Sequence, residues 1–130
     1  MRGESDRLAG RLTLPAQRRL RRKAEFDAAY ANGRRFGNGF FGVIAFLNDK
    51  GWPRLGLAVA VRAAGGGVLR NRIRRIVRES FRLHQHTLPS VDLIVSARAR
   101  AKDAAGPELH ASLAGLWKKV TEQCATSSRS

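Results

Sequence analysis

The clearest pattern of hydrophobic and polar positions lies in residues 69–83, LRNRIRRIVRESFRL. At the 100° per residue of an α-helix, apolar side chains gather in one arc, with Phe81 at its margin, and arginines gather opposite. Arg72 and Glu79 share a flank, where they could pair weakly. The pattern predicts an amphipathic helix that packs on a core by one face. The apolar arc is Leu69, Ile73, Ile76, Val77, Ser80 and Leu83; the polar side is Arg70, Asn71, Arg74, Arg75, Arg78 and Arg82.

Three short apolar runs, at 40–47, 55–61 and 91–98, are rich in branched or aromatic residues and are too short for typical helices. Turn residues at 48–54 separate the first two runs, which predicts that they pair as an antiparallel hairpin. In the second run large side chains alternate with small ones. The small side, Gly56, Ala58 and Ala60, either lets a helix approach closely or leaves room for a ligand, and close packing is the favoured interpretation.

Two further helices are predicted at 24–33 and 107–120. In the first, Phe26, Ala29 and Tyr30 recur at helical spacing before a stop at Asn32-Gly33. The second begins with a proline, carries an early glutamate and ends near two lysines, as helix capping and the helix dipole favour. Its apolar stripe is assigned to the core: Leu109, Leu113, Leu116, Trp117 and Val120.

The predicted order of elements is α-β-β-α-β-α, with an additional short strand around 34–37, which indicates an α+β or α/β sandwich. Residues 1–17 show no sustained periodicity and are expected to form a flexible basic arm. Residues 18–120 are expected to form one domain, and 121–130 a flexible tail.

Charge changes this picture most: 25 lysines and arginines face 10 acidic residues, for a net charge of +15 in 130 residues. Such an excess repels itself in a compact fold and is typical of proteins that bind a polyanion, nucleic acid first and an anionic membrane second. Arginine predominates, and guanidinium groups bind phosphate bidentately and stack on bases. Arginines one turn apart on the 69–83 helix repel one another without a nearby acid, so that face is expected to meet an external polyanion.

Other sequence features indicate where in the cell the protein is expected. No run of about 18 apolar residues exists to span a bilayer, and the N-terminal residues lack the apolar stretch of a secretory signal. The single cysteine, Cys124, allows no internal disulfide, which fits a reducing cytosol. A cytoplasmic location and no membrane partner are therefore expected. The glycines at 65–67 could form a phosphate-binding nest at the start of the arginine helix, or an open connection.

The sequence bears on four functional classes that such a charge allows. A protein nuclease needs clustered carboxylates or a histidine acid-base pair, and neither His84, His86 and His110 nor the acids form one in the sequence. A DNA-binding regulator lacks a second helix at helix-turn-helix spacing. A membrane-surface role would need the apolar face that the sheet uses. A basic ribosomal or other structural RNA-binding protein remains the alternative.

Residues 68–81, VLRNRIRRIVRESF, resemble the signature of the bacterial ribonuclease P protein family, with its Arg-Asn-Arg helix and later Arg-Glu pair. The resemblance extends to the opening helix with its basic approach at 19–30, to 54–61, to 92–98 and to the closing helix. It covers about residues 18–120. It implies a two-layer α-β sandwich with a four-stranded sheet, three helices and a left-handed β-α-β crossover, like domain 2 of ribosomal protein S5. General principles alone would have favoured the commoner right-handed crossover.

The resemblance also implies a function. Proteins of this family bind the catalytic RNA of ribonuclease P, which uses magnesium ions to remove 5′ leaders from precursor tRNA. The protein itself is expected to contribute no catalytic residue and no metal ligand, and to need no obligate protein partner. Its partners would be the catalytic RNA and precursor tRNA.

Site residues follow from the same resemblance. The expected RNA-binding residues are Arg70, Asn71, Arg72, Arg74, Arg75, Arg78 and Arg82, with auxiliary contacts from Arg18, Arg19, Arg21, Arg22 and Lys23. Phe26 and Tyr30 match aromatics of the leader-binding cleft, where rings stack on unpaired bases; from the residues alone, burial in the core is equally favoured. The other candidates for that cleft are Ile44, Ala58, Val61 and Arg62. Family members often have serines and lysines where this chain has Ala58 and Val61, and a tyrosine at Ile44, so a less polar cleft is expected, with Arg62 supplying part of the charge.

Overall fold

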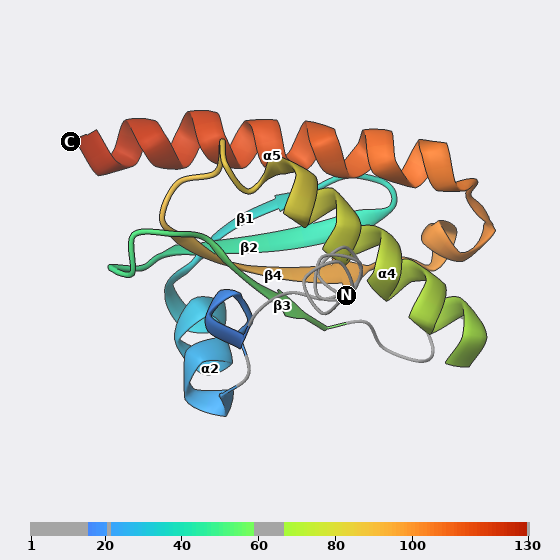
Figure 1. Ribbon diagram of the computed structural model, residues 1–130, viewed down its shortest axis with the longest axis horizontal. Coiled ribbons are helices and arrows are strands. Elements are labelled where there is room, and N and C mark those ends of the chain that lie inside the picture. Colours follow the sequence, from blue (N-terminus) through green and yellow to red (C-terminus); the bar gives the residue numbers. More distant parts are fainter. Residues whose placement is uncertain (1–15, 21, 59–66, 130) are drawn as a thin grey trace, which may run out of the picture.

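The computed structural model describes residues 16–20, 22–58 and 67–129, which form a four-stranded sheet with helices on both faces (Figure 1). The predicted strand at 34–37 is present. All three predicted helices begin within two residues of their expected starts, and the first two also end within one residue of their expected ends. The elements are η1 (Ala16–Arg18), α2 (Lys23–Asn32), β1 (Arg34–Gly37), β2 (Phe41–Leu47), β3 (Arg54–Leu57), α4 (Gly67–His84), β4 (Val91–Ala97), η2 (Ala99–Asp103) and α5 (Gly106–Arg129).

The sheet has the strand order β1-β2-β4-β3, with β2 antiparallel to β1 and β4, and β3 parallel to β4. The predicted hairpin between the second and third strands is therefore wrong. The turn residues after Leu47 do reverse the chain, but β4 inserts between the two strands and pairs with both. The small side chains and local turn signals near Gly51 carried no information about this later strand.

The connection from β3 through α4 to β4 is a β-α-β crossover between parallel neighbours. In Figure 1 both strands run from left to right, β4 lies above β3, and α4 passes in front of them, which is the left-handed sense. The resemblance implied this sense, and the general preference for right-handed crossovers would have missed it.

The main core lies between the sheet and the pair α4 and α5, which cover one face together (Figure 1). Every residue of the predicted stripe on α5 is buried. Phe81 is fully buried, and its ring meets that of Trp117 edge-on at 6.2 Å between centroids. The Trp117 indole Nε1 donates a hydrogen bond of 2.8 Å to the Ser80 hydroxyl, so the one polar residue of the apolar arc of α4 is satisfied.

Two details differ from the sequence prediction. Leu83 is 57% exposed, whereas Phe81, expected only at the margin, is buried, because α5 lies on the Phe81 side of α4. The chain also does not leave the helix at 121: α5 continues to Arg129, and Cys124 is buried against the main core. The expected tail thus starts as an extension of the closing helix.

The opposite face of the sheet carries α2 and a minor core of four buried residues, Leu20, Ala29, Ile44 and Ile94. Figure 1 shows α2 below one end of the sheet. The polypeptide before α2 runs along the β3 edge, where Arg19 forms a parallel bridge with Leu55 and the Leu20 amide donates to the Leu55 carbonyl at 2.9 Å. Within the described ranges, no helix is long and apolar enough to cross a membrane.

Candidate nucleic-acid interface

The outer side of α4 carries the predicted arginines. Asn71 and Arg75 are exposed, and the other five arginines are half-buried, so part of each of these long side chains packs against the fold. Across the part of the chain that the structure describes, none of these arginines forms an ion pair with a carboxylate. The Nε atoms of Arg70, Arg74 and Arg82 are buried and lack a hydrogen-bond partner among those same residues. This face therefore concentrates positive charge that the described fold does not neutralise.

Two arginines of this face, Arg74 and Arg78, line a groove of about 200 Å³ along the β3 edge. Arg19, whose backbone bridges to Leu55 of β3, lines the same groove. Burial first, and then the charges of Arg74 and Arg19, lower the pKa of Arg78. Three cations thus share one small space, an arrangement that an anion would stabilise. We call it the arginine groove; its lining is Arg19, Leu20, Phe26, Leu55, Leu57, Arg74 and Arg78.

The arginine groove also brings one candidate aromatic next to the arginines. Phe26 extends from α2 toward β3, where its ring packs against Gly56: a β-carbon on that glycine would stand 2.8 Å from the ring Cζ. At Gly56 the small-residue side of the strand therefore serves close packing, the favoured interpretation. Tyr30, one turn further along α2, is 43% exposed and available to a ligand.

The remaining cleft candidates divide between buried and half-open positions. Ile44 is buried in the minor core, where it packs against α2, so it supports the helix from beneath. Ala58 is half-buried at the end of β3, and its amide donates to the Val95 carbonyl at 2.9 Å. Val61, Arg62 and the auxiliary candidate Arg21 lie outside the described residues.

Beyond the end of α2, the same face of the sheet carries a row of small side chains that are exposed or half-buried. The strand register aligns Gly37 with Gly42 and Gly42 with Ser96, and Ala58 directly follows Leu57, which pairs with Val95. Arg98 reaches over this row, since a β-carbon on Gly37 would stand 2.7 Å from its Nη2. The sequence prediction did not single out Arg98. The only signal was its position after an apolar strand, and the glycines it covers are identifiable only once the pairing of β1, β2 and β4 is known.

The auxiliary basic residues are not equivalent. Lys23 forms an exposed ion pair with Asp27 at 2.9 Å, and the hydrogen bond within this pair raises the pKa of Lys23. Arg22 precedes α2 and is exposed, and Arg18 is half-buried in η1. Arg72, which could have paired weakly with Glu79, instead donates from Nη2 to the Ala104 carbonyl at 3.0 Å and ties α4 to the end of η2.

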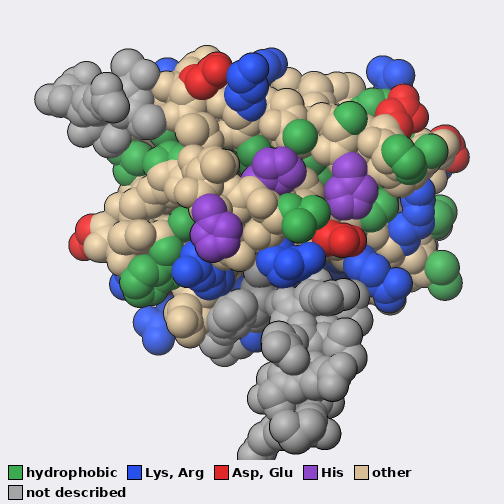
Figure 2. Space-filling model, turned by 45° about the horizontal axis from the view of Figure 1, so that its top comes forward, with side chains coloured by type: hydrophobic (Ala, Val, Ile, Leu, Met, Phe, Trp, Pro, Cys, Tyr) green, Lys and Arg blue, Asp and Glu red, His purple; other side chains and the backbone are tan. Residues whose placement is uncertain are grey.

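The histidines lie away from the arginine groove. Figure 2 shows all three on the face over α4 and α5, with lysine and arginine side chains along its lower border. His84 is engaged through Nδ1 with the Ser80 carbonyl at 2.8 Å. Among residues 16–20, 22–58 and 67–129, no three histidine, cysteine or acidic side chains come close enough together to hold a metal ion.

Comparison with known proteins agrees with this arrangement. The family model described as Ribonuclease P matches residues 14–121. The ribonuclease P protein component of Yersinia enterocolitica is 37% identical over 117 residues, which cover 90% of this chain and 98% of that protein. The component of Cronobacter sakazakii is 38% identical over 109 residues, covering 84% and 92%.

Solved structures show the same fold. The ribonuclease P protein of Staphylococcus aureus superposes with a TM-score of 0.72 at 32% identity, covering 82% of this chain and 94% of that one. The protein of Thermotoga maritima does so with a TM-score of 0.72 at 27% identity, covering 78% and 96%. With its Arg-Asn-Arg helix on a sheet of this topology, the chain belongs to the ribonuclease P protein family.

Proposed function

We propose that this protein, as the protein subunit of ribonuclease P, binds the catalytic RNA through the outer face of α4 and the 5′ leader of precursor tRNA beside α2. The observation that carries the proposal is the arginine groove. It brings Arg74 and Arg78 of α4 within one hollow of Phe26 of α2. An RNA strand leaving the arginine face would therefore meet the aromatic side chains directly.

The arginine face supports the first half of the proposal through its electrostatics. Arginines at i, i+4 spacing repel one another, and buried Nε donors without partners cost free energy in the isolated protein. Phosphate oxygens accept bidentate hydrogen bonds from guanidinium groups and release counterions on binding. A structured RNA presents phosphate oxygens close together, as arginines one helical turn apart require for simultaneous contact.

The surface beside α2 supports the second half. Tyr30 is exposed at the C-terminal end of α2, and Arg35 donates from Nη2 to its carbonyl at 3.2 Å, which fixes the helix end against β1. The row of small residues covered by Arg98 lies on the same face of the sheet as α2. A single strand could place bases on the aromatic rings and phosphates near Arg98, with little dependence on base identity. That tolerance suits an enzyme that must accept many leaders.

In this proposal the hydrolysis belongs to the RNA subunit, together with the magnesium ions that it uses. The carboxylates on and beside α2 are already engaged, because Glu25 and Asp92 both pair with Arg54 and Asp27 pairs with Lys23. The protein would contribute affinity for the precursor and support for the folded RNA, rather than an acid, a base or a nucleophile.

The test compares precursor tRNA with mature tRNA, which lacks the leader, on the complex of this chain with its catalytic RNA. Phe26→Leu and Tyr30→Leu should lower affinity for the precursor several-fold, since base stacking on an aromatic ring contributes roughly 1–3 kcal/mol against alanine and less against leucine. Affinity for mature tRNA should stay constant. Phe46→Leu is the matched control, because Phe46 is a partly buried aromatic on the same sheet face outside the arginine groove. Folded Phe26→Leu and Tyr30→Leu variants that prefer precursor over mature tRNA as strongly as the parent does would refute leader binding at α2.

A further inference from the structure

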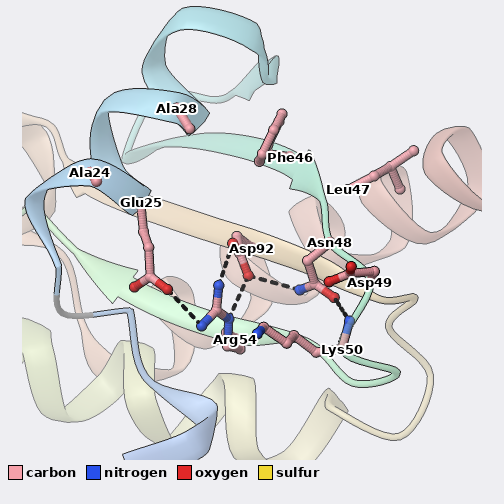
Figure 3. A pocket seen from close by; sticks show the side chains of 10 residues that line it. All are labelled: Ala24, Glu25, Ala28, Phe46, Leu47, Asn48, Asp49, Lys50, Arg54 and Asp92. Atoms are coloured by element: carbon pink, nitrogen blue, oxygen red, sulfur yellow. Dashed lines mark hydrogen bonds and ion pairs between the residues drawn. The ribbon is translucent and has the colours of Figure 1, made fainter.

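Arg54 on β3 joins three elements of the fold through its guanidinium group. It holds the Asp92 carboxylate of β4 with two parallel hydrogen bonds, both 2.8 Å, from Nε and Nη2. Its third nitrogen, Nη1, donates to Glu25 Oε2 of α2 at 2.9 Å. Figure 3 shows the Arg54 guanidinium between the two acids on the floor of a pocket. The hydrogen bond to Asp92 raises the pKa of Arg54.

Asp92 is fixed from a second side, so Arg54 is held on a rigid base. Asn48 donates from Nδ2 to Asp92 Oδ1 at 2.7 Å, and the Asn48 side chain also bonds the loop after β2. The side chain of Asp92 is 5% exposed and that of Arg54 12%. A buried, bidentate and doubly supported pair of this kind has little freedom to move. The Glu25 side chain, at 27% exposure, is the outer member of the network.

Glu25 uses its two carboxylate oxygens for different elements. Oε2 accepts from Arg54, and Oε1 accepts from the Arg22 amide at the start of α2, at 3.4 Å in a capping-box arrangement. The carboxylate therefore links the first turn of α2 to the sheet. Phe26 is the next residue along the helix, and it packs on Gly56, two residues after Arg54 on the same side of β3.

Apolar packing alone holds α2 weakly. Ala29 is the only buried residue of the helix, and three further residues, Leu20, Ile44 and Ile94, complete the minor core. The helix must nevertheless keep Phe26 at the arginine groove and Tyr30 over the open face. The hydrogen-bonded ion pair of Glu25, the residue before Phe26, adds a directional bond between α2 and β3.

We propose that the Arg54–Glu25 pair is a positioning contact for leader binding: it sets the place of α2 on the sheet and thereby the place of Phe26 in the arginine groove. The inference rests on the proposed leader-binding function. It assigns a role in leader binding to two residues, Arg54 and Glu25, that do not themselves touch the RNA. Loss of the pair leaves Arg54 with Asp92, so the sheet keeps its network while α2 gains freedom.

The test uses two substitutions on α2 that each remove one negative charge. Glu25→Gln keeps the length of the side chain and the capping acceptor but weakens the bond to Arg54. Asp27→Asn removes the partner of Lys23 in an exposed ion pair, in which the Lys23 side chain is 89% exposed and that of Asp27 60%. Both variants raise the net charge equally, so a difference between them reports position and not electrostatic attraction for RNA. Glu25→Asp, which keeps the charge but shortens the reach, is the third variant.

On the complex with catalytic RNA, Glu25→Gln and Glu25→Asp should each lower the ratio of precursor to mature tRNA affinity by about threefold or more, a loss of pre-organisation. Asp27→Asn should leave this ratio within about twofold of the parent. Amide exchange of residues 26–32 should quicken in the Glu25 variants alone. The thermal midpoint, measured alongside, ensures that each variant is folded at the assay temperature.

Three results would overturn the inference: the first two leave the proposed function standing, and the third refutes both. If Phe26→Leu lowers the ratio while both Glu25 variants keep it, leader binding stands and the positioning contact is refuted. If the Glu25 variants weaken both tRNAs equally, the pair has only a structural role. If Phe26→Leu itself leaves the ratio unchanged, the leader site at α2 fails, and the positioning contact fails with it.

Discussion

The ring of Phe26 lies against Gly56 so closely that a β-carbon at position 56 would stand 2.8 Å from its Cζ and 3.0 Å from the Leu20 Cβ. Glycine is needed there for the approach of α2 and of the segment before it, and not for a special backbone angle, because Gly56 lies within β3. One missing side chain thus determines where an aromatic of the arginine groove can stand.

Gly56→Ala should therefore displace Phe26 and destabilise the protein by about 1–3 kcal/mol, the usual effect of overpacking. The free energy of unfolding from urea titration measures the destabilisation, and the affinity ratio of precursor to mature tRNA reports the displacement of Phe26. Gly115→Ala is the control, because a β-carbon there would meet nothing within 4 Å and alanine favours the helix. A Gly56→Ala protein as stable and as selective as the parent would show that the contact is not tight.

The arginine face should act on RNA affinity and not on folding. Arg70→Ala with Arg74→Ala should lower the slope of log affinity against log salt for the catalytic RNA, by about 0.7–0.9 for each lost phosphate contact. Lys118→Ala with Lys119→Ala removes the same charge from exposed positions on α5 and should change the slope little. Equal slopes for the arginine variant and the parent would remove this face from the RNA interface.

The buried hydrogen bond between Trp117 and Ser80 should matter for stability alone. Ser80→Ala leaves the indole Nε1 buried without its acceptor, which should cost about 1–3 kcal/mol in the free energy of unfolding. Thr121→Ala removes a hydroxyl whose hydrogen bond to the Thr87 carbonyl is exposed, and its cost should be within about 0.5 kcal/mol. The two variants should share the salt dependence of the parent; a changed slope for folded Ser80→Ala would contradict a purely structural role.

Cys124 should make stability fall at alkaline pH. Burial raises the pKa of its thiol, against the weaker opposing effect of Arg34. A raised pKa in the folded state means that the stabilisation is complete below the unfolded pKa of about 8.5 and is lost as pH rises through the folded value. Urea titrations from pH 7 to 10 should show a steeper loss of stability for the parent than for Cys124→Ala. Parallel pH profiles would indicate that the thiol is not buried in solution.

How far the sequence predicts this structure depends on whether a feature is local. The faces of α4 and α5 follow from helical periodicity, and α5 carries its whole predicted stripe to the core. The exposure of Leu83 and the burial of Phe81, at the edge of the apolar face, could not be predicted, because they depend on where α5 crosses α4. The false hairpin has the same origin: β4 is distant in the sequence, and its insertion beside β3 is a non-local event.

The candidate site divides in the same way. The arginines of α4 are recognisable from spacing and charge, whereas the arginine groove depends on the bridge of Arg19 to β3 and on the left-handed path of the crossover. Arg54 gave no signal in the sequence beyond its place at the start of a strand. Its two partners, Glu25 and Asp92, lie 29 and 38 residues away.

The most direct test of two RNA surfaces on one chain is site-specific photo-cross-linking in the assembled complex with precursor tRNA. A cross-linking amino acid in place of Tyr30 should attach to leader nucleotides, and one in place of Arg75 should attach to the catalytic RNA. The same group at Lys118, exposed on α5, serves as the background control. Cross-links from position 30 that map to the leader, and vanish with mature tRNA, are the predicted result; cross-links from position 30 that never involve the leader would contradict the account.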